Sequence, residues 1–265
     1  MITQKMEYSS FDGTKKSIHF YFPDDWKKDD RRGAAVLFHG GGWIRGTADQ
    51  FVPHASELTR LGMVVALPSY RLLESDHATV DIAVRDAMAA LQFVFDNSSE
   101  MGIDPQKVVA GGGSAGGHLA MSAVLLDEFM PQGYTCKHAI QALLLFNPVI
   151  DAVDIKERNE SLKLCSYDAK QLSPYHHLRP NMPETLIFQG TADTVVPLSH
   201  LQEFEKKMEE LGNACHVFLY EGRQHSFFNL TSTNVIQDYY DILGHVVDFL
   251  FRRNILEIKI KKVDD

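Results

Sequence analysis

The chain has 265 residues, of which 45% are hydrophobic, and its formal net charge is −9 at pH 7. A chain of this length can bury one well-packed core, which predicts a single domain over residues 1–265. The acidic balance, without a run of basic residues, argues against nucleic acid or an anionic membrane as a partner. No apolar stretch approaches the length of a membrane span.

The cysteine content bears on the compartment. Three cysteines, Cys136, Cys165 and Cys215, are an odd number and do not suggest a disulfide framework. They indicate reduced thiols in a cytoplasmic protein. The first residues lack the apolar core of a secretory leader. A secreted protein whose leader had been removed would show the same sequence, so that alternative stays open.

Strand-like and helical patterns alternate along the chain. The pair Asp12-Gly13 separates two short runs and predicts a hairpin turn. Nearly continuous apolar runs, typical of parallel strands covered on both faces, then recur at Ala34–Phe38, Met63–Leu67, Val108–Ala110, Ile140–Phe146, Thr185–Gln189 and His216–Tyr220. Helical periodicity appears between them at Thr79–Asp96, Leu201–Leu211 and Val235–Phe251. The alternation predicts an α/β fold with a mostly parallel, doubly wound sheet flanked by helices.

A glycine run follows the first of these strands, in the sequence His39-Gly-Gly-Gly-Trp43. Glycines at this place let the backbone bend close to a ligand and point its N–H groups at a developing oxyanion. The expected donors are the N–H groups of Gly41 and Gly42, joined by that of Ala115 further along the chain. His39 is expected to brace the loop rather than to take part in chemistry.

The pattern G-x-S-x-G occupies Gly112–Gly116, between the strand-like run that ends at Ala110 and an expected helix. A strand, a sharp turn that holds a serine, and then a helix form the context of a nucleophile elbow. The turn would expose the hydroxyl of Ser114 near the positive end of the helix. Ser114 is therefore the candidate nucleophile.

An acid and a histidine follow later strands in the same manner. Asp193 lies in the Gly-rich turn after the run Thr185–Gln189, and His225 follows His216–Tyr220. An aspartate at this place can orient the histidine, which takes the serine proton and returns it to the leaving group. The chain order Ser, Asp, His is that of α/β-hydrolases.

Other side chains compete for these roles. Asp151 also follows a strand-like run, but Asp193 is favoured because its turn leads into a new helix. His118 lies in the helix just past Ser114, so its ring is expected to point away from the nucleophile.

Together the motifs resemble those of α/β-hydrolase esterases of the hormone-sensitive-lipase-like branch. The similarity is greatest to the compact subgroup that contains bacterial acetyl esterases and feruloyl esterases. It covers nearly the whole chain, and rests on His39–Trp43, Gly112–Gly117, Gly190–Asp193 and His225–Phe228, with connecting motifs at Ser69–Leu72 and Gly102–Pro105.

The resemblance implies an α/β-hydrolase fold and assigns roles by position. Ser114 is then the nucleophile, Asp193 the acid and His225 the base, and the oxyanion donors are those of the glycine loop and of the elbow. The chain departs from the branch in having only 38 residues before His39, where a long helical cap usually stands. This departure favours an open site for small or polar esters.

Two segments do not fit the minimal scheme. Residues 151–183 form a long insertion between strands, which is interpreted either as a small lid or pocket wall or as a surface loop. Near the C-terminus, Leu256, Ile258 and Ile260 alternate with charged residues. This is typical of a strand added to a sheet edge, in this chain or in the partner copy of a homodimer. An irregular end is the other interpretation.

The sequence therefore predicts a serine carboxylesterase that acts on short-chain acyl esters of small molecules, with acetylated or feruloylated carbohydrates suggested by the resemblance. Neither a metal nor an organic cofactor is implied. Residues expected near the substrate, each equally explained by packing, are Trp43, Tyr70, His177 and Phe227.

Two other functions stay open from the sequence. A formamidase of the arylformamidase type shares the His-Gly-Gly-x-Trp loop, so this motif does not separate ester from amide substrates. A non-enzymatic binding protein on the same fold is the remaining alternative, because fold alone does not imply function.

Overall fold

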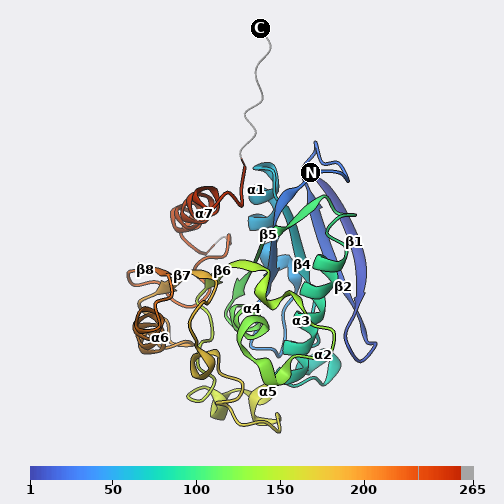
Figure 1. Ribbon diagram of the computed structural model, residues 1–265. Coiled ribbons are helices and arrows are strands. Elements are labelled where there is room, and N and C mark those ends of the chain that lie inside the picture. Colours follow the sequence, from blue (N-terminus) through green and yellow to red (C-terminus); the bar gives the residue numbers. More distant parts are fainter. Residues whose placement is uncertain (232, 258–265) are drawn as a thin grey trace.

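The computed structural model describes residues 1–231 and 233–257. In this part of the chain eight strands form one sheet, in the order β1-β2-β4-β3-β5-β6-β7-β8 (Figure 1). The strands are β1 (Ile2–Ser9), β2 (Lys15–Phe22), β3 (Arg32–Phe38), β4 (Val64–Pro68), β5 (Ile103–Gly113), β6 (Ile140–Phe146), β7 (Glu184–Gly190) and β8 (Cys215–Tyr220). β2 pairs antiparallel with β1 and with β4. The strands β4, β3, β5, β6, β7 and β8 run parallel to one another.

Helices cover both faces of the sheet (Figure 1). They are α1 (Val52–Arg60), α2 (Leu73–Asp76), α3 (Val80–Asp96), α4 (Ala115–Leu125), α5 (Glu160–Lys163), α6 (Leu198–Glu210) and α7 (Ile236–Arg252). Buried side chains of α3, α4 and α6 belong to one apolar cluster, and those of α1 and α7 to another. The doubly wound, mostly parallel sheet predicted from the sequence is confirmed.

The central strands separate the two clusters because alternate side chains point to opposite faces. In β3, Val36 and Phe38 pack into the cluster of α3 and α4, whereas Ala35 and Leu37 pack into that of α1 and α7. All four are buried. Continuous burial of this kind explains why the strand reads as an uninterrupted apolar run.

Element boundaries agree closely with the sequence patterns, with one informative exception. The run Val108–Ala110 is only the middle of β5, which continues through three glycines to Gly113. A Cβ atom at Gly111 would lie 2.3 Å from the carbonyl oxygen of Leu144 on β6. The glycines belong to the strand because a side chain at each would collide with a different neighbour: Leu144 at Gly111, Phe38 at Gly112 and Phe228 at Gly113.

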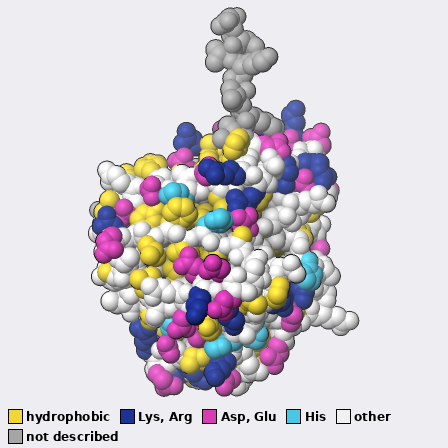
Figure 2. Space-filling model, turned by 60° about the vertical axis from the view of Figure 1, so that its left-hand side comes forward, with side chains coloured by type: hydrophobic (Ala, Val, Ile, Leu, Met, Phe, Trp, Pro, Cys, Tyr) yellow, Lys and Arg dark blue, Asp and Glu magenta, His cyan; other side chains and the backbone are white. Residues whose placement is uncertain are grey.

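The face formed by α6, α7 and β8 carries apolar side chains among charged ones (Figure 2). Large apolar residues exposed in this region are Leu219, Ile236, Tyr240 and Phe251. None of the described helices is long and apolar enough to cross a membrane. Of the alternating C-terminal residues, Leu256 is buried, whereas Ile258 and Ile260 lie outside the described residues.

A buried ion pair joins the turn of the N-terminal hairpin to α3. Asp86, fully buried on α3, accepts hydrogen bonds at 2.6 and 2.8 Å from the guanidinium of Arg71. It also accepts one at 2.6 Å from the hydroxyl of Ser10, next to the hairpin turn, while Arg71 bonds Asp12 in that turn at 2.7 Å. The hairpin, the loop after β4 and α3 are thus joined through one carboxylate.

The other apolar cluster contains an unpartnered histidine. His54 on α1 is packed among aromatic rings, with centroids 5.4 Å from Phe146 and 4.9 Å from Tyr239. Neither ring nitrogen has a hydrogen-bond partner within the described chain. Burial lowers the pKa of His54 to about 3, so the ring is neutral in the folded protein.

Replacing Asp86 by alanine is expected to destabilise the protein by about 3 kcal/mol, because it leaves the guanidinium of Arg71 without its buried partner. Chemical denaturation of the variant measures this loss. Asp96→Ala, at an exposed position of the same helix, is the matched control and should change stability by less than about 0.5 kcal/mol. Equal effects of the two substitutions would contradict a structural role for the ion pair.

The neutral state of His54 predicts acid sensitivity. The unfolded chain binds a proton at this histidine below about pH 6.5, whereas the folded chain does not, so stability falls as the pH drops. Between about pH 7.5 and about pH 5 the loss from this residue is about 2 kcal/mol. Denaturation of His54→Phe at both pH values should show a loss smaller by that amount. An unchanged pH dependence would rule out this contribution.

Candidate active site

Ser114 occupies a sharp turn between β5 and α4. Its backbone has φ +54° and ψ −118°, a conformation that non-glycine residues rarely adopt. The turn is fixed by hydrogen bonds from the Ser114 N–H to Phe146 and to the Ser114 carbonyl from Val149. A Cβ atom at Gly116 would lie 2.0 Å from the carbonyl oxygen of Phe38, so a side chain cannot be accommodated beside the turn. This is the geometry of a nucleophile elbow.

The serine, the histidine and the aspartate form one hydrogen-bonded line. His225 Nε2 lies 2.9 Å from Ser114 Oγ, and His225 Nδ1 lies 2.7 Å from Asp193 Oδ2. Each of the three residues follows a strand of the parallel part of the sheet: β5, β7 or β8. Side-chain exposure falls from 17% at His225 to 0% at Asp193, so the carboxylate is shielded from water and the imidazole is reachable.

The carboxylate of Asp193 is held by four hydrogen bonds. Besides His225, the Gln189 amide donates at 3.0 Å, and the N–H groups of Val195 and Val196 donate at 2.8 and 3.0 Å. Burial raises its pKa, but the hydrogen bond to His225 and those from the backbone outweigh burial, so the pKa is lowered. The group is therefore an anion that orients the imidazole.

Asp151, the competing acid, points elsewhere. It accepts a hydrogen bond of 2.8 Å from Ser173 and lies 3.4 Å from His176. His118 also lies away from the nucleophile, with Nε2 at 2.6 Å from the carbonyl oxygen of Leu172. The structure thus brings together Ser114, His225 and Asp193, and not their competitors.

The glycine loop after β3 turns back toward Ser114. Gly41 has φ +115° and Gly42 φ +65°, and a Cβ atom at Gly41 would lie 1.8 Å from the carbonyl oxygen of Arg45. Their N–H groups have no hydrogen-bond acceptor in the described part of the chain. Ala115 is the first residue of α4, where an N–H has no partner within the helix. All three groups are free to donate to an anion.

Side chains from several elements hold this loop. Gln50 Oε1 accepts a hydrogen bond of 2.6 Å from the Gly40 N–H, and Asn159 Nδ2 donates to the Gly42 carbonyl at 3.3 Å. The Tyr70 hydroxyl donates to the His39 carbonyl at 2.8 Å. The loop is therefore held at His39 by Tyr70 and at Gly42 by Asn159 of the insertion.

His39 braces the loop from within. Its ring stacks on Tyr70 with a centroid separation of 4.3 Å, and Nδ1 lies 2.7 Å from the Gly40 carbonyl oxygen. Burial lowers the pKa of His39 to about 4, so the ring is neutral and Nδ1 carries the proton in this hydrogen bond. The position agrees with the expected bracing role.

A cavity of about 380 Å³ opens beside Ser114 and His225. It lies between the glycine loop and the insertion, which contributes Ile155, Arg158 and Asn159 to the wall. Its remaining lining residues are Gly40, Gly41, Gly42, Trp43, Ile44, Arg45, Gln50, Val149, Val195 and Ser226. The insertion is thus a pocket wall, one of the two interpretations of its sequence.

Of the four residues expected near the substrate, three do not line this cavity. Trp43 lines it. Tyr70 is buried beneath the glycine loop, and Phe227 is buried against Tyr220, with ring centroids 4.8 Å apart. His177 lies in a 3₁₀ helix of the insertion, with Nε2 at 3.2 Å from the Lys170 carbonyl oxygen.

Asn147 is a site residue that the sequence patterns did not reveal. This fully buried residue follows β6 with φ +39°, and its N–H donates to the Phe188 carbonyl at 2.7 Å. Its Oδ1 accepts a hydrogen bond of 2.9 Å from the N–H of Ser226, whose φ is +65°. Asn147 thereby fixes the turn that carries His225. Its place directly after a strand was the available signal.

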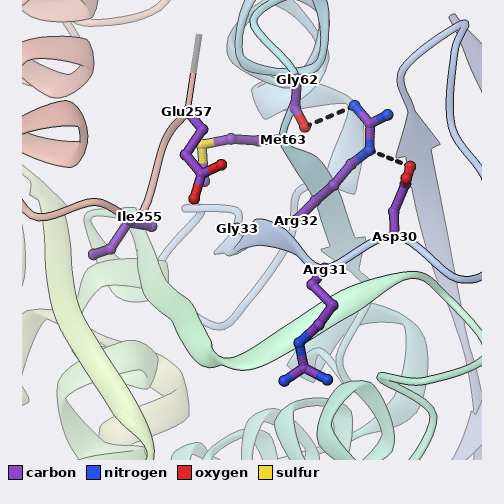
Figure 3. A pocket seen from close by; sticks show the side chains of 8 residues that line it. All are labelled: Asp30, Arg31, Arg32, Gly33, Gly62, Met63, Ile255 and Glu257. Carbon is purple, nitrogen blue, oxygen red and sulfur yellow. Dashed lines mark hydrogen bonds and ion pairs between the residues drawn. The ribbon is translucent and has the colours of Figure 1, made fainter. Parts of the chain in front are cut away.

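Another cavity, of about 210 Å³, lies at the opposite end of the strands, near the starts of β3 and β4 (Figure 3). Its most buried charged residue, Arg32, donates to Asp30 at 2.6 Å and to the Gly62 carbonyl at 3.2 Å. These contacts are structural. Within the described residues no group of three or more His, Cys, Asp or Glu side chains is placed to hold a metal ion.

Comparisons with known proteins agree with this geometry. The sequence model of the BD-FAE family matches residues 18–208. Esterase LipQ of Mycobacterium tuberculosis is 26% identical over 232 residues, which are 79% of this chain and 55% of that protein. The probable carboxylic ester hydrolase LipM of the same organism is 28% identical over 71% of this chain and 48% of its own. The chain thus spans about half the length of these relatives.

Solved structures match over nearly the full length. The apo form of Thermogutta terrifontis esterase 2 is 35% identical, covers 97% of both chains and has a TM-score of 0.89. The same esterase phosphorylated by paraoxon is 35% identical over 97% of this chain and 96% of that one, with a TM-score of 0.87.

Proposed function

Because the chain belongs to the BD-FAE family and has the α/β-hydrolase fold, we propose that it is a serine carboxylesterase that hydrolyses short-chain acyl esters. The observation that carries the proposal is the hydrogen-bonded line from Ser114 through His225 to Asp193, which opens into a cavity. Nucleophile, base and orienting acid in this geometry define the triad mechanism of acyl transfer.

The first half-reaction forms an acyl-enzyme. His225 Nε2 accepts the proton of Ser114 Oγ while the oxygen attacks the ester carbonyl carbon. The Asp193 carboxylate accepts the Nδ1–H hydrogen bond and stabilises the imidazolium. The carbon–oxygen bond to the alcohol then breaks, and His225 returns its proton to the departing oxygen. A water molecule repeats these steps on the acyl-enzyme and releases the acid.

The glycine loop stabilises the tetrahedral intermediates. The carbonyl oxygen becomes negative when Ser114 attacks, and the free N–H groups of Gly41, Gly42 and Ala115 are the donors available there. Loss of one such donor commonly lowers the rate by about two to three orders of magnitude. The neutral ring of His39 supports the loop without adding charge to this site.

The volume of the cavity supports a small acyl or alcohol group. About 380 Å³ lies at the small end of the usual range for ligand sites. Its wall comes from the insertion rather than from a large helical cap. We therefore expect short acyl chains, with acetylated or feruloylated carbohydrates as the esters suggested by the resemblance.

We expect the protein to act in the cytoplasm on small-molecule esters, either as a monomer or as a homodimer. The three cysteines support this compartment because each is a free thiol, and Cys136 and Cys165 are buried. Burial raises the pKa of the Cys136 thiol to about 12, which keeps it unreactive.

Hydrolysis of para-nitrophenyl esters, from acetate to long chains, tests the proposed function. Activity should be greatest for the short chains, and Ser114→Ala should lower kcat by roughly four to six orders of magnitude, because the nucleophile is lost. Circular dichroism of the variant checks that the fold is intact. Most of the hydrolysis persisting in the variant would overturn the assignment. Turnover of aryl formamides alone would instead indicate a formamidase, and failure of an organophosphate probe to label Ser114 would indicate a binding protein.

Asn147→Ala is expected to lower kcat about ten- to a hundredfold with little change in KM, because the turn that carries His225 loses its support. Steady-state kinetics on para-nitrophenyl acetate measures both constants. Gln141→Ala, at an exposed position of β6, the strand that precedes Asn147, is the control and should leave both constants unchanged. An equal fall in the two variants would argue against a positioning role for Asn147.

A further inference from the structure

The charge of the catalytic cavity is opposite to that of the protein. The chain has 35 acidic and 26 basic residues, yet among the described residues that line the cavity none is aspartate or glutamate. Two of them are arginines, Arg45 and Arg158. Besides His225, these are its charged or titratable lining residues. A ligand that enters the cavity therefore meets positive charge.

Arg158 is oriented but not neutralised. It ends a short 3₁₀ helix of the insertion, and its guanidinium donates to the carbonyl oxygens of Thr194 and Val195 at 3.2 and 2.8 Å. Carbonyl oxygens carry no net charge, so the arginine keeps its positive charge at the cavity wall. A guanidinium has five N–H donors, and the two contacts leave others for a ligand.

Arg45 also lines the cavity, on the loop that follows the oxyanion glycines. Its nearest acidic partner is Glu74, at 4.0 Å, and both side chains are largely exposed. An exposed ion pair at this separation contributes little stabilisation, so Glu74 does not hold Arg45 away from a ligand. The acidic residues near Arg158 in the sequence are Asp154, Glu157 and Glu160, and none of them lines the cavity. Asp154 instead contacts His200 at 2.8 Å.

We propose that the natural ester carries a carboxylate, which Arg45 and Arg158 bind while the reacting carbonyl lies at Ser114. The substrate class is thus a monoester of a dicarboxylic acid or an acylated hydroxy acid. Arginine suits this task because its planar fork matches the two oxygens of a carboxylate. The inference rests on the proposed esterase function and adds to it the charge of the substrate.

Two substrate pairs test the inference, and in each pair a carboxylate is exchanged for a neutral group while hydrolysis of the same aryl ester bond is followed. Para-acetoxybenzoate and its methyl ester place the carboxylate on the alcohol side. Mono-para-nitrophenyl adipate and para-nitrophenyl hexanoate place it on the acyl side. For at least one pair, kcat/KM of the anionic ester should exceed that of the neutral ester by about tenfold. This ratio should fall several-fold when NaCl is raised from about 0.05 to about 0.5 M, because the arginines are solvent-accessible.

The double variant Arg45→Gln/Arg158→Gln should remove the preference. The loss of Arg158 also affects the turn that follows Asp193. This effect cancels in the ratio of the two kcat/KM values, because both esters depend on the same triad. The double variant Arg60→Gln/Arg252→Gln is the matched control, because these arginines lie at the exposed ends of α1 and α7 and the substitutions remove the same two charges. Its ratio should equal that of the wild type.

A ratio near one in the wild type for both pairs, or an equal ratio in the double variant, would overturn the inference and leave the esterase function standing. Absence of hydrolysis of all four esters would overturn both proposals. The two failures are therefore distinguishable.

Discussion

The close approach of α4 to the end of β3 is the constraint on which the site depends. A Cβ atom at Gly116 on α4 would lie 2.0 Å from the Phe38 carbonyl oxygen, and one at Gly112 on β5 would lie 2.4 Å from it, so only glycine is accommodated at either position. Because α4 and β3 meet, the loop after β3 and the turn that holds Ser114 line the same cavity. The strained backbone of Ser114 is the local cost of bringing the hydroxyl to that cavity.

Parallel pairing then supplies the remaining groups. Gly113 pairs with Phe146 on β6, Phe146 pairs with Phe188 on β7, and Gly190 pairs with Tyr220 on β8. Strands held in this register end along one edge, so the turns that follow them lie side by side. The chain order of serine, aspartate and histidine is therefore a consequence of strand order. Asn147 lies at the same end of the sheet because it follows β6, the strand between β5 and β7.

The resemblance to α/β-hydrolase carboxylesterases is confirmed by the family match and the solved structures, and the sheet was predictable because buried strands read as apolar runs. The serine, aspartate and histidine were predictable because each stands in a short motif after such a run. Arg158 and Asn147 were not, since an irregular insertion has no periodicity and a single asparagine forms no pattern. Tyr70 and Phe227 do not line the cavity, because nearness to a motif in sequence does not fix the direction of a side chain.

The insertion is attached to both halves of the catalytic machinery. Asn159 bonds the glycine loop at Gly42, and Arg158 bonds the turn that follows Asp193. A segment that walls the pocket therefore also supports the groups that carry out the reaction. It is not a modular part: exchanging residues 151–183 for the corresponding segment of a relative, to obtain a new specificity, would also remove two supports of the active site unless the graft kept both side chains.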